Sequence, residues 1–130
     1  MKLFRLMKTD ADGKPVVGSR SMMLGVRPIK PAQPAWRPDV RATAGDDPVQ
    51  PLDGGLSCYT DPSDIAFRPK RVRLWSLDAT DLPPELVARF TGPTSHHQVE
   101  PAVEMTLDAF QQLLSATREA WQLEPEGGAS

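Results

Sequence analysis

Proline is the feature that most constrains this fold, because 14 of the 130 residues are proline, against a usual share of roughly 5%. A proline has no backbone N–H, so it interrupts helices and removes a hydrogen bond from a sheet. One segment, "RPIKPAQPAWRPD", contains four of them: Pro28, Pro31, Pro34 and Pro38. We therefore exclude a helical bundle and interpret residues 8–51 as an ordered loop that covers the rest of the domain and is anchored by Trp36.

Alternating or continuous apolar runs predict four strands. They cover residues 2–7, 55–60, 70–78 and 95–103, and in the last of them Pro101 restricts the strand to an edge or marks its end. Asp61 is placed to cap a helical turn that begins at Pro62. The segment "LPPELVARF", residues 82–90, is interpreted as a short helix entered through its two prolines.

The C-terminal third contains the most regular helical pattern. In "MTLDAFQQLLSATREAWQL", residues 105–123, apolar side chains recur every three or four positions. Thr106 is a suitable N-cap, and Pro125 ends the helix. The fold class is therefore α+β, with one domain over residues 1–124 and a flexible tail over 125–130.

Cysteine, histidine and motif content exclude several classes of protein. The single cysteine, Cys58, cannot form an internal disulfide, and the N-terminal apolar run is too short for a signal peptide or a membrane span, so we expect a cytoplasmic site of action. Export by a route without a cleavable signal stays possible. There is no G-x-G-x-x-G, P-loop or H-E-x-x-H motif. His96 and His97 are adjacent on a strand and face opposite sides, so we predict no metal site.

Charge is divided unevenly along the chain. Residues 1–41 carry nine Lys or Arg against three Asp, whereas residues 74–130 carry two Arg against nine acidic residues. A basic N-terminal part suits an anionic ligand such as pyrophosphate, and the acidic C-terminal part would repel a nucleic acid. The distribution favours a small phosphorylated ligand and disfavours nucleic acid, although each charge could also belong to a solvated surface.

The segment "DGGLSCYTD", residues 53–61, raises the question of which side chain is functional. Strand alternation places Ser57 and Tyr59 on one face and Cys58 on the other, so we interpret the cysteine as core packing. Gly54 and Gly55 would allow the backbone to turn tightly and to approach a ligand closely.

Polar residues on three predicted strands could meet in one cleft. Arg5 lies on the first strand, Ser57 and Tyr59 on the second, and His96 and Glu100 share a face of the last. An arginine pairs with pyrophosphate, a hydroxyl positions a ribose, an aromatic ring stacks on nicotinamide and a carboxylate stabilises a cationic sugar. These groups suit the binding of NAD and cleavage of its glycosidic bond. The same three faces could equally point to solvent.

Several segments resemble, in the same order, the Tse-two family of type VI secretion toxins. They are "LFRL" near the N-terminus, "LSCYTD" after the two glycines, "DATDLPPELV", and "SHHQVEPAVEMTLDAFQQLLSATREAW". The resemblance implies an ADP-ribosyltransferase-like split β-sheet, NAD as substrate, toxicity in the cytosol of a target cell and neutralisation by an immunity protein. It maps Arg5, Ser57 and His96 onto family positions.

The resemblance also leaves three functions open. In the first, an NAD-dependent ADP-ribosyltransferase, Arg5 binds the phosphates, Gly55, Ser57 and Tyr59 hold the rest of NAD, and Ser57, His96 and Glu100 carry the reaction. The family's wider class uses a Glu-x-Glu pair that this chain lacks, so Glu104 is the alternative acid. The second is a non-catalytic binding protein of the same fold, and the third is an NAD-dependent RNA 2′-phosphotransferase supported by the basic residues up to Arg73.

Overall fold

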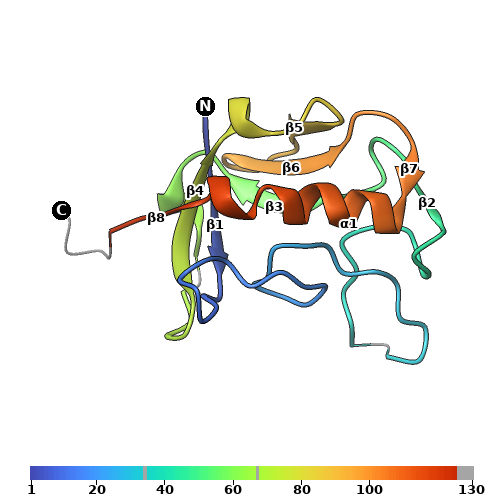
Figure 1. The fold of residues 1–130 in the computed structure, drawn as a ribbon, viewed down its shortest axis with the longest axis horizontal. Helices are drawn as coiled ribbons and strands as arrows, with labels where there is room; N and C mark the ends of the chain where they lie inside the picture. Colours follow the sequence, from blue (N-terminus) through green and yellow to red (C-terminus); the bar gives the residue numbers. More distant parts are fainter. Residues whose placement is uncertain (34, 67, 126–130) are drawn as a thin grey trace.

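The computed structural model describes residues 1–33, 35–66 and 68–125, and its centre is an antiparallel six-stranded sheet (Figure 1). In spatial order the strands are β5 (Leu86–Phe90), β6 (His96–Pro101), β3 (Leu56–Tyr59), β1 (Lys2–Met7), β4 (Arg73–Asp78) and β8 (Gln122–Leu123). The short strands β2 (Pro48–Val49) and β7 (Met105–Thr106) form a separate pair. The helices are α1 (Leu107–Ala116) and three 3-10 turns, η1 (Pro62–Asp64), η2 (Ala79–Asp81) and η3 (Arg118–Ala120). The predicted α+β class is confirmed, as are the four predicted strands and the turn capped by Asp61.

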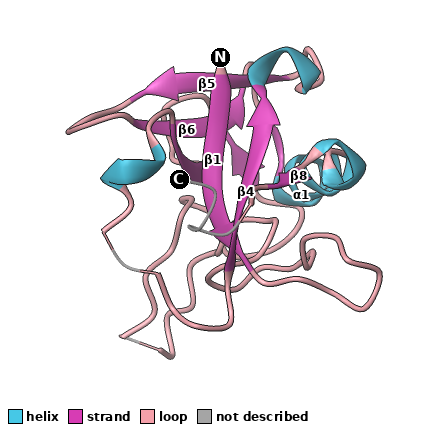
Figure 2. Cartoon of the chain, turned by 90° about the vertical axis from the view of Figure 1, so that its left-hand side faces the viewer, coloured by secondary structure: helices cyan, strands magenta, loops and turns pink. Residues whose placement is uncertain are grey.

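Helix α1 packs along one face of the sheet, and the core lies between the helix and the sheet (Figure 2). The sheet contributes fully buried side chains from its central strands, among them Leu3, Met7, Leu56, Cys58, Trp75 and Leu77. The helix contributes Phe110 and Leu114, which recur at helical spacing on its inner side. Both faces of β1 are buried, since Phe4 and Leu6 are covered as well.

The helix α1 begins where the sequence predicts and ends earlier. Thr106 caps it, because its Oγ1 accepts a hydrogen bond from Ala109 N at 3.1 Å. After Ala116 the chain tightens into η3, and the buried Thr117 donates from Oγ1 to Leu114 O at 2.6 Å and accepts from Trp121 Nε1 at 3.0 Å. The prediction of a helix up to residue 123 is wrong, because residues 122–123 instead pair with β4 as an edge strand.

The cap gives a first prediction. Thr106→Ala leaves Ala109 N–H without its partner and should lower the free energy of unfolding by about 1 kcal/mol, which lowers the melting temperature by roughly 3–6 °C. Thermal unfolding followed by circular dichroism measures the change. Thr9→Ala, at an exposed threonine outside any helix, is the matched control and should leave the melting temperature unchanged. Equal melting temperatures for the two variants would contradict a stabilising cap.

The predicted helix over residues 82–90 is wrong. The two prolines there precede β5, which pairs with β6 along its whole length, with Val87 opposite Glu100 and Arg89 opposite Gln98. Pairing with a neighbouring strand overrides the weak helical preference of this short segment. As a result β6 is an internal strand, and Pro101 lies at its end.

The loop between β1 and β3 covers one end of the sheet, as predicted, but Trp36 does not anchor it in the core. Trp36 is half-buried and is held locally, by a hydrogen bond from Nε1 to Pro28 O at 2.6 Å and by Lys30, whose Nζ lies 3.9 Å from the ring centroid. The anchors are the smaller buried side chains Leu24, Val26, Val40 and Ala42. The side chain of Gln111 on α1 completes the attachment, since it bonds both the N–H and the carbonyl of Val26, at 2.9 and 2.7 Å.

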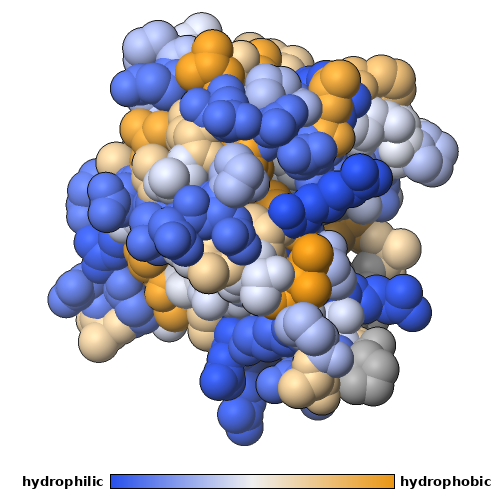
Figure 3. Space-filling model, turned by 90° about the vertical axis from the view of Figure 1, so that its right-hand side faces the viewer, coloured by the Kyte–Doolittle hydropathy of each residue, from blue (hydrophilic) through white to orange (hydrophobic). Residues whose placement is uncertain are grey.

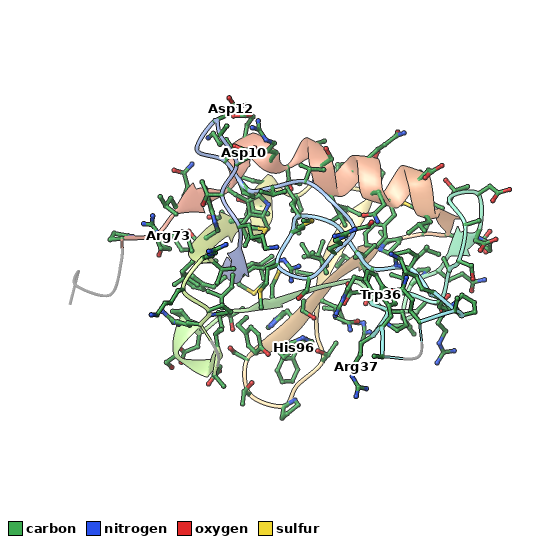
Figure 4. All side chains as sticks on the ribbon, turned by 90° about the horizontal axis from the view of Figure 1, so that it is seen from below. Asp10, Asp12, Trp36, Arg37, Arg73 and His96 are labelled. Carbon is green, nitrogen blue, oxygen red and sulfur yellow. The ribbon has the colours of Figure 1, made fainter. Side chains whose placement is uncertain are left out.

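A cluster of charges ties the turn at residues 10–12, just after β1, to η3, which follows α1. Arg118 Nη2 lies 2.8 Å from Asp10 and 3.2 Å from Asp12, and its Nη1 lies 2.6 Å from Glu119. Figure 4 shows Asp10 and Asp12 beside the C-terminal end of α1. The hydrogen bond from Arg118 holds the pKa of Asp10 below its ordinary value. The arginine is surrounded by acidic partners, which is the environment of a structural cation.

The surface is mixed in character. On the face seen in Figure 3 hydrophilic residues predominate, and the hydrophobic ones form small separate groups. Within residues 1–33, 35–66 and 68–125, no helix combines the length and apolar character that a membrane span requires. The predicted flexible tail over 125–130 lies, apart from Pro125, outside the described residues.

Candidate functional site

A cavity of about 350 Å³ opens beside the place where β1 and β3 meet. These two strands pair at Phe4 opposite Tyr59, and the loop between them forms the other wall. The charged and polar side chains that line the cavity include Arg5, Arg27, Asp39, Ser57 and Tyr59. Its volume is at the lower end of the range typical of small-molecule sites. A second cavity, of about 390 Å³, lies beside the start of α1.

Arg5 is the most unusual residue of the cavity. Its Nη1 donates to Ser57 O at 2.9 Å and its Nη2 to Met23 O at 2.8 Å, so the side chain joins β3 to the covering loop. Its Nε is buried and has no hydrogen-bond partner among the described residues. Burial lowers the pKa of the guanidinium below its ordinary value. A buried donor without a partner is rare in folded proteins, and the guanidinium keeps its positive charge beside the cavity.

Ser57 and Tyr59 occupy the same face of β3, as the alternation predicts. Both are partly exposed, whereas the alternate residues of the strand, Leu56 and Cys58, are buried. The two side chains line the cavity together with Arg5. Three of the predicted site residues are therefore brought together by adjacent strands.

Cys58 belongs to the core, and its chemistry follows from that position. It is fully buried, and burial raises the pKa of its thiol to about 12. Because the thiolate is the reactive form, we predict that a thiol reagent at pH 8 fails to modify the native protein and modifies it fully in denaturant. Absorbance of the released chromophore measures the reaction, and stoichiometric labelling of the native protein would contradict the core position.

Two further charged residues share the cavity, and the sequence pattern singled out neither of them. Asp39 Oδ2 accepts from Arg27 N at 2.8 Å and from Arg27 Nε at 3.1 Å, and Oδ1 accepts from Nη2 at 3.1 Å. Both residues lie in the proline-rich loop, where periodicity gives no information. The excess of basic residues up to Arg41 is the signal that could have pointed to Arg27.

His96 lies next to the cavity residues without lining the cavity. It is opposite Tyr59 in the pairing of β3 with β6, and the two rings meet edge to face with centroids 5.2 Å apart. Its Nδ1 contacts the hydroxyl of Thr91. Partial burial, and then the neighbouring His97, lower the pKa of His96. Figure 4 places His96 on the side of the sheet away from α1.

Glu100 is not brought to this cavity. Its carboxylate is buried, with Oε1 2.7 Å from Arg89 Nε and Oε2 accepting from Leu52 N at 2.9 Å. The alternative acid, Glu104, is exposed in the turn before β7. Neither residue lines the cavity that contains Arg5. The expected convergence of His96, Ser57 and Glu100 in one cleft is therefore incomplete, because the neighbouring strand β5 covers Glu100 with Arg89.

The two glycines before Ser57 serve the backbone of the protein itself. A Cβ on Gly55 would lie 2.3 Å from Val99 O on β6, and a Cβ on Gly54, whose φ is +115°, would lie 1.9 Å from Asp39 O. We predicted that these glycines let the backbone approach a ligand. In the structure the space beside them is filled by β6 and by the covering loop. Gly54 thereby allows the loop to place Asp39 beside β3.

The fold is an antiparallel α+β domain with a small-molecule cavity at the junction of β1 and β3. A sequence model described as Tse2 ADP-ribosyltransferase toxin matches residues 2–121. The chain therefore belongs to the Tse2 ADP-ribosyltransferase toxin family, as its segments suggested. This membership indicates a transferase in class and implies NAD as the substrate. No curated protein and no solved structure matches the chain. Among the described residues there is no group of three side chains able to hold a metal ion.

Proposed function

We propose that this protein is an NAD-dependent ADP-ribosyltransferase toxin whose substrate binds in the cavity beside β1 and β3. The observation that carries the proposal is Arg5, a buried guanidinium whose Nε has no partner among the described residues, in a cavity of about 350 Å³. The positive charge of this guanidinium at the cavity wall would attract the pyrophosphate of NAD. Family membership supplies the reaction class.

The reaction breaks the glycosidic bond between nicotinamide and its ribose. Nicotinamide leaves with the bonding electrons, and the ribose C1′ forms a new bond to an acceptor that loses a proton. Arg5 would bind and neutralise the phosphates, Ser57 would orient the nicotinamide ribose and Tyr59 would stack on the ring. His96 would hold the Tyr59 ring through the edge-to-face contact, a positioning role. In this proposal the ADP-ribosyltransferase-like sheet divides between β1 and β3, at the single paired position Phe4 and Tyr59.

The biological setting is proposed from the family. The protein would act as a type VI secretion effector in the cytosol of a target cell, and a cognate immunity protein would neutralise it. Expression in a bacterial host, with and without the neighbouring open reading frame, tests this part. Growth arrest that the neighbour relieves supports it, and normal growth with the toxin alone counts against it.

Release of nicotinamide from NAD by the purified protein tests the activity. Chromatography should show nicotinamide appearing in step with loss of NAD, and Ser57→Ala should slow it by about tenfold or more. Ser63→Ala is the matched control, because Ser63 does not line the cavity and its exposed hydroxyl donates a hydrogen bond to Asp61. Stable NAD in the presence of folded protein would contradict the proposal.

One observation favours a second function, NAD binding without turnover. Neither Glu100 nor Glu104 lines the cavity, and the carboxylate that does, Asp39, is bonded to Arg27. Calorimetry with NAD separates the two functions. Binding with no release of nicotinamide would identify a binding protein, and release of nicotinamide an enzyme.

A further inference from the structure

We propose that Arg27 is a second anion-binding residue of the Arg5 cavity, and that Asp39 is its internal counter-ion, which opposes the ligand's charge and so limits affinity. The inference deepens the proposed function and rests on it for the nature of the ligand. It assigns recognition of a diphosphate to two arginines on different segments, one on β1 and one in the covering loop.

The cavity carries more positive than negative charge. Arg5 and Arg27 both line it, with Asp39 as the acidic side chain among the lining residues. Burial is the main cause that lowers the pKa of Arg5; Cys58 and Asp39 raise it, and Arg27 lowers it to a smaller extent, so both charged residues of the loop act on Arg5. Two guanidinium groups face one carboxylate, which leaves an excess of positive charge for an anion to neutralise.

Arg27 has fewer acidic partners than Arg118, the structural arginine described above. Arg118 lies within salt-bridge distance of three acidic residues, Asp10, Asp12 and Glu119. Arg27 has one acidic partner, and its Nη1 makes no hydrogen bond to any residue in the described part of the chain. Arg27 therefore keeps a donor for a ligand, whereas the donors of Arg118 are shared among acidic neighbours.

The backbone of Asp39 is held in place by contacts that do not depend on the side chain of Arg27. Asp39 N donates to Arg27 O at 2.8 Å, and Val40 forms a bridge to Gly54. The carbonyl of Asp39 packs so closely on Gly54 that no Cβ fits there. The carboxylate is thus held beside β3 whether or not Arg27 turns toward a ligand. Its charge competes with phosphate for Arg27 and repels phosphate bound at Arg5.

Calorimetric titration of the full chain with inorganic pyrophosphate tests the inference. Arg27→Gln should weaken binding by about tenfold or more, because a charge-assisted donor is lost. Asp39→Asn should strengthen binding by several-fold to about tenfold, because the competing charge is removed while an acceptor oxygen for Arg27 N–H is kept. Arg37→Gln, which removes a cation from an exposed position of the same loop, is the matched control and should change the affinity by less than about twofold. Figure 4 shows Arg37 pointing away from the domain.

The opposite signs of the two effects distinguish an anion site from a structural ion pair. If Arg27→Gln and Asp39→Asn weaken pyrophosphate binding equally, the pair is scaffold and the inference is overturned. An unchanged affinity in Arg27→Gln, or no binding to the wild-type protein, overturns it as well. Should Asp39→Asn fail to fold, the Nε–H resonance of Arg27 in the wild-type protein gives the answer. It should shift with pyrophosphate along the calorimetric binding curve, and a static resonance would refute the assignment.

The role of Arg27 and the proposed NAD reaction can each hold or fail independently of the other. If the wild-type protein releases no nicotinamide but the two substitutions still change pyrophosphate affinity in opposite directions, the second anion residue stands and the NAD reaction falls. If nicotinamide is released and Arg27→Gln binds pyrophosphate as the wild type does, the NAD reaction stands and the inference falls.

Discussion

Arg5→Ala should reduce nicotinamide release from NAD by about 30-fold or more. The substitution removes the buried guanidinium that lines the cavity and whose Nε lacks a partner among the described residues. Losing a charge-assisted contact to a desolvated phosphate costs about 2–5 kcal/mol, which corresponds to roughly 30-fold to several thousand-fold in affinity or rate. The initial rate of nicotinamide release at saturating and subsaturating NAD measures the effect.

Arg5→Lys and Arg41→Ala separate this role from general loss of charge. Lysine keeps the charge but cannot bridge Ser57 O and Met23 O as a fork does, so we expect partial activity. Arg41 is an exposed cation of the covering loop, and Arg41→Ala should retain the wild-type rate. Wild-type turnover by folded Arg5→Ala protein would show that the cavity is not the NAD site.

Glu100→Ala should lower the free energy of unfolding by about 3 kcal/mol. The carboxylate is buried, and its removal leaves the Leu52 N–H without an acceptor and Arg89 without its partner at 2.7 Å. Breaking one side of a buried ion pair costs about 3–5 kcal/mol, and the lower end applies because Arg89 is 37% exposed and can turn to water. Urea unfolding followed by tryptophan fluorescence measures the change.

Replacing the same residue with glutamine decides between a structural and a catalytic role for Glu100. Glu104→Ala removes an exposed carboxylate from the turn that follows β6 and should change stability by less than about 0.5 kcal/mol. At a temperature where Glu100→Gln is fully folded, we expect it to release nicotinamide at a rate near that of the wild type. Loss of turnover in a Glu100→Gln protein of wild-type stability would instead place Glu100 in the reaction.

Strands were predictable where the hydrophobic pattern was continuous. Residues 2–7 and 55–60 carry such apolar or alternating side chains, and both contribute strands to the central sheet. Residues 86–90 were misread as helix because their strand character depends on β6, a partner that local sequence does not show. Thr117 and Trp121 continue the helical spacing after α1 ends, but the chain between them forms η3, and the residues after Trp121 pair with β4 as β8.

The site was predictable in part for a similar reason. Arg5, Ser57 and Tyr59 stand on strands, and alternation together with family resemblance placed them on one cavity. Arg27 and Asp39 come from a loop whose path is set by tertiary contacts, including the close approach of Asp39 O to Gly54. Glu100 shares a strand face with His96, but alternation does not reveal that β5 lies beside it and supplies Arg89.

The most direct test of the central claim is amide chemical-shift mapping of the protein titrated with NAD. A cavity site beside β1 and β3 predicts that the shifted signals cluster at Arg5, Ser57 and Tyr59 and follow one binding curve. Shifts confined to the surroundings of Glu100, or to the second cavity beside the start of α1, would contradict it.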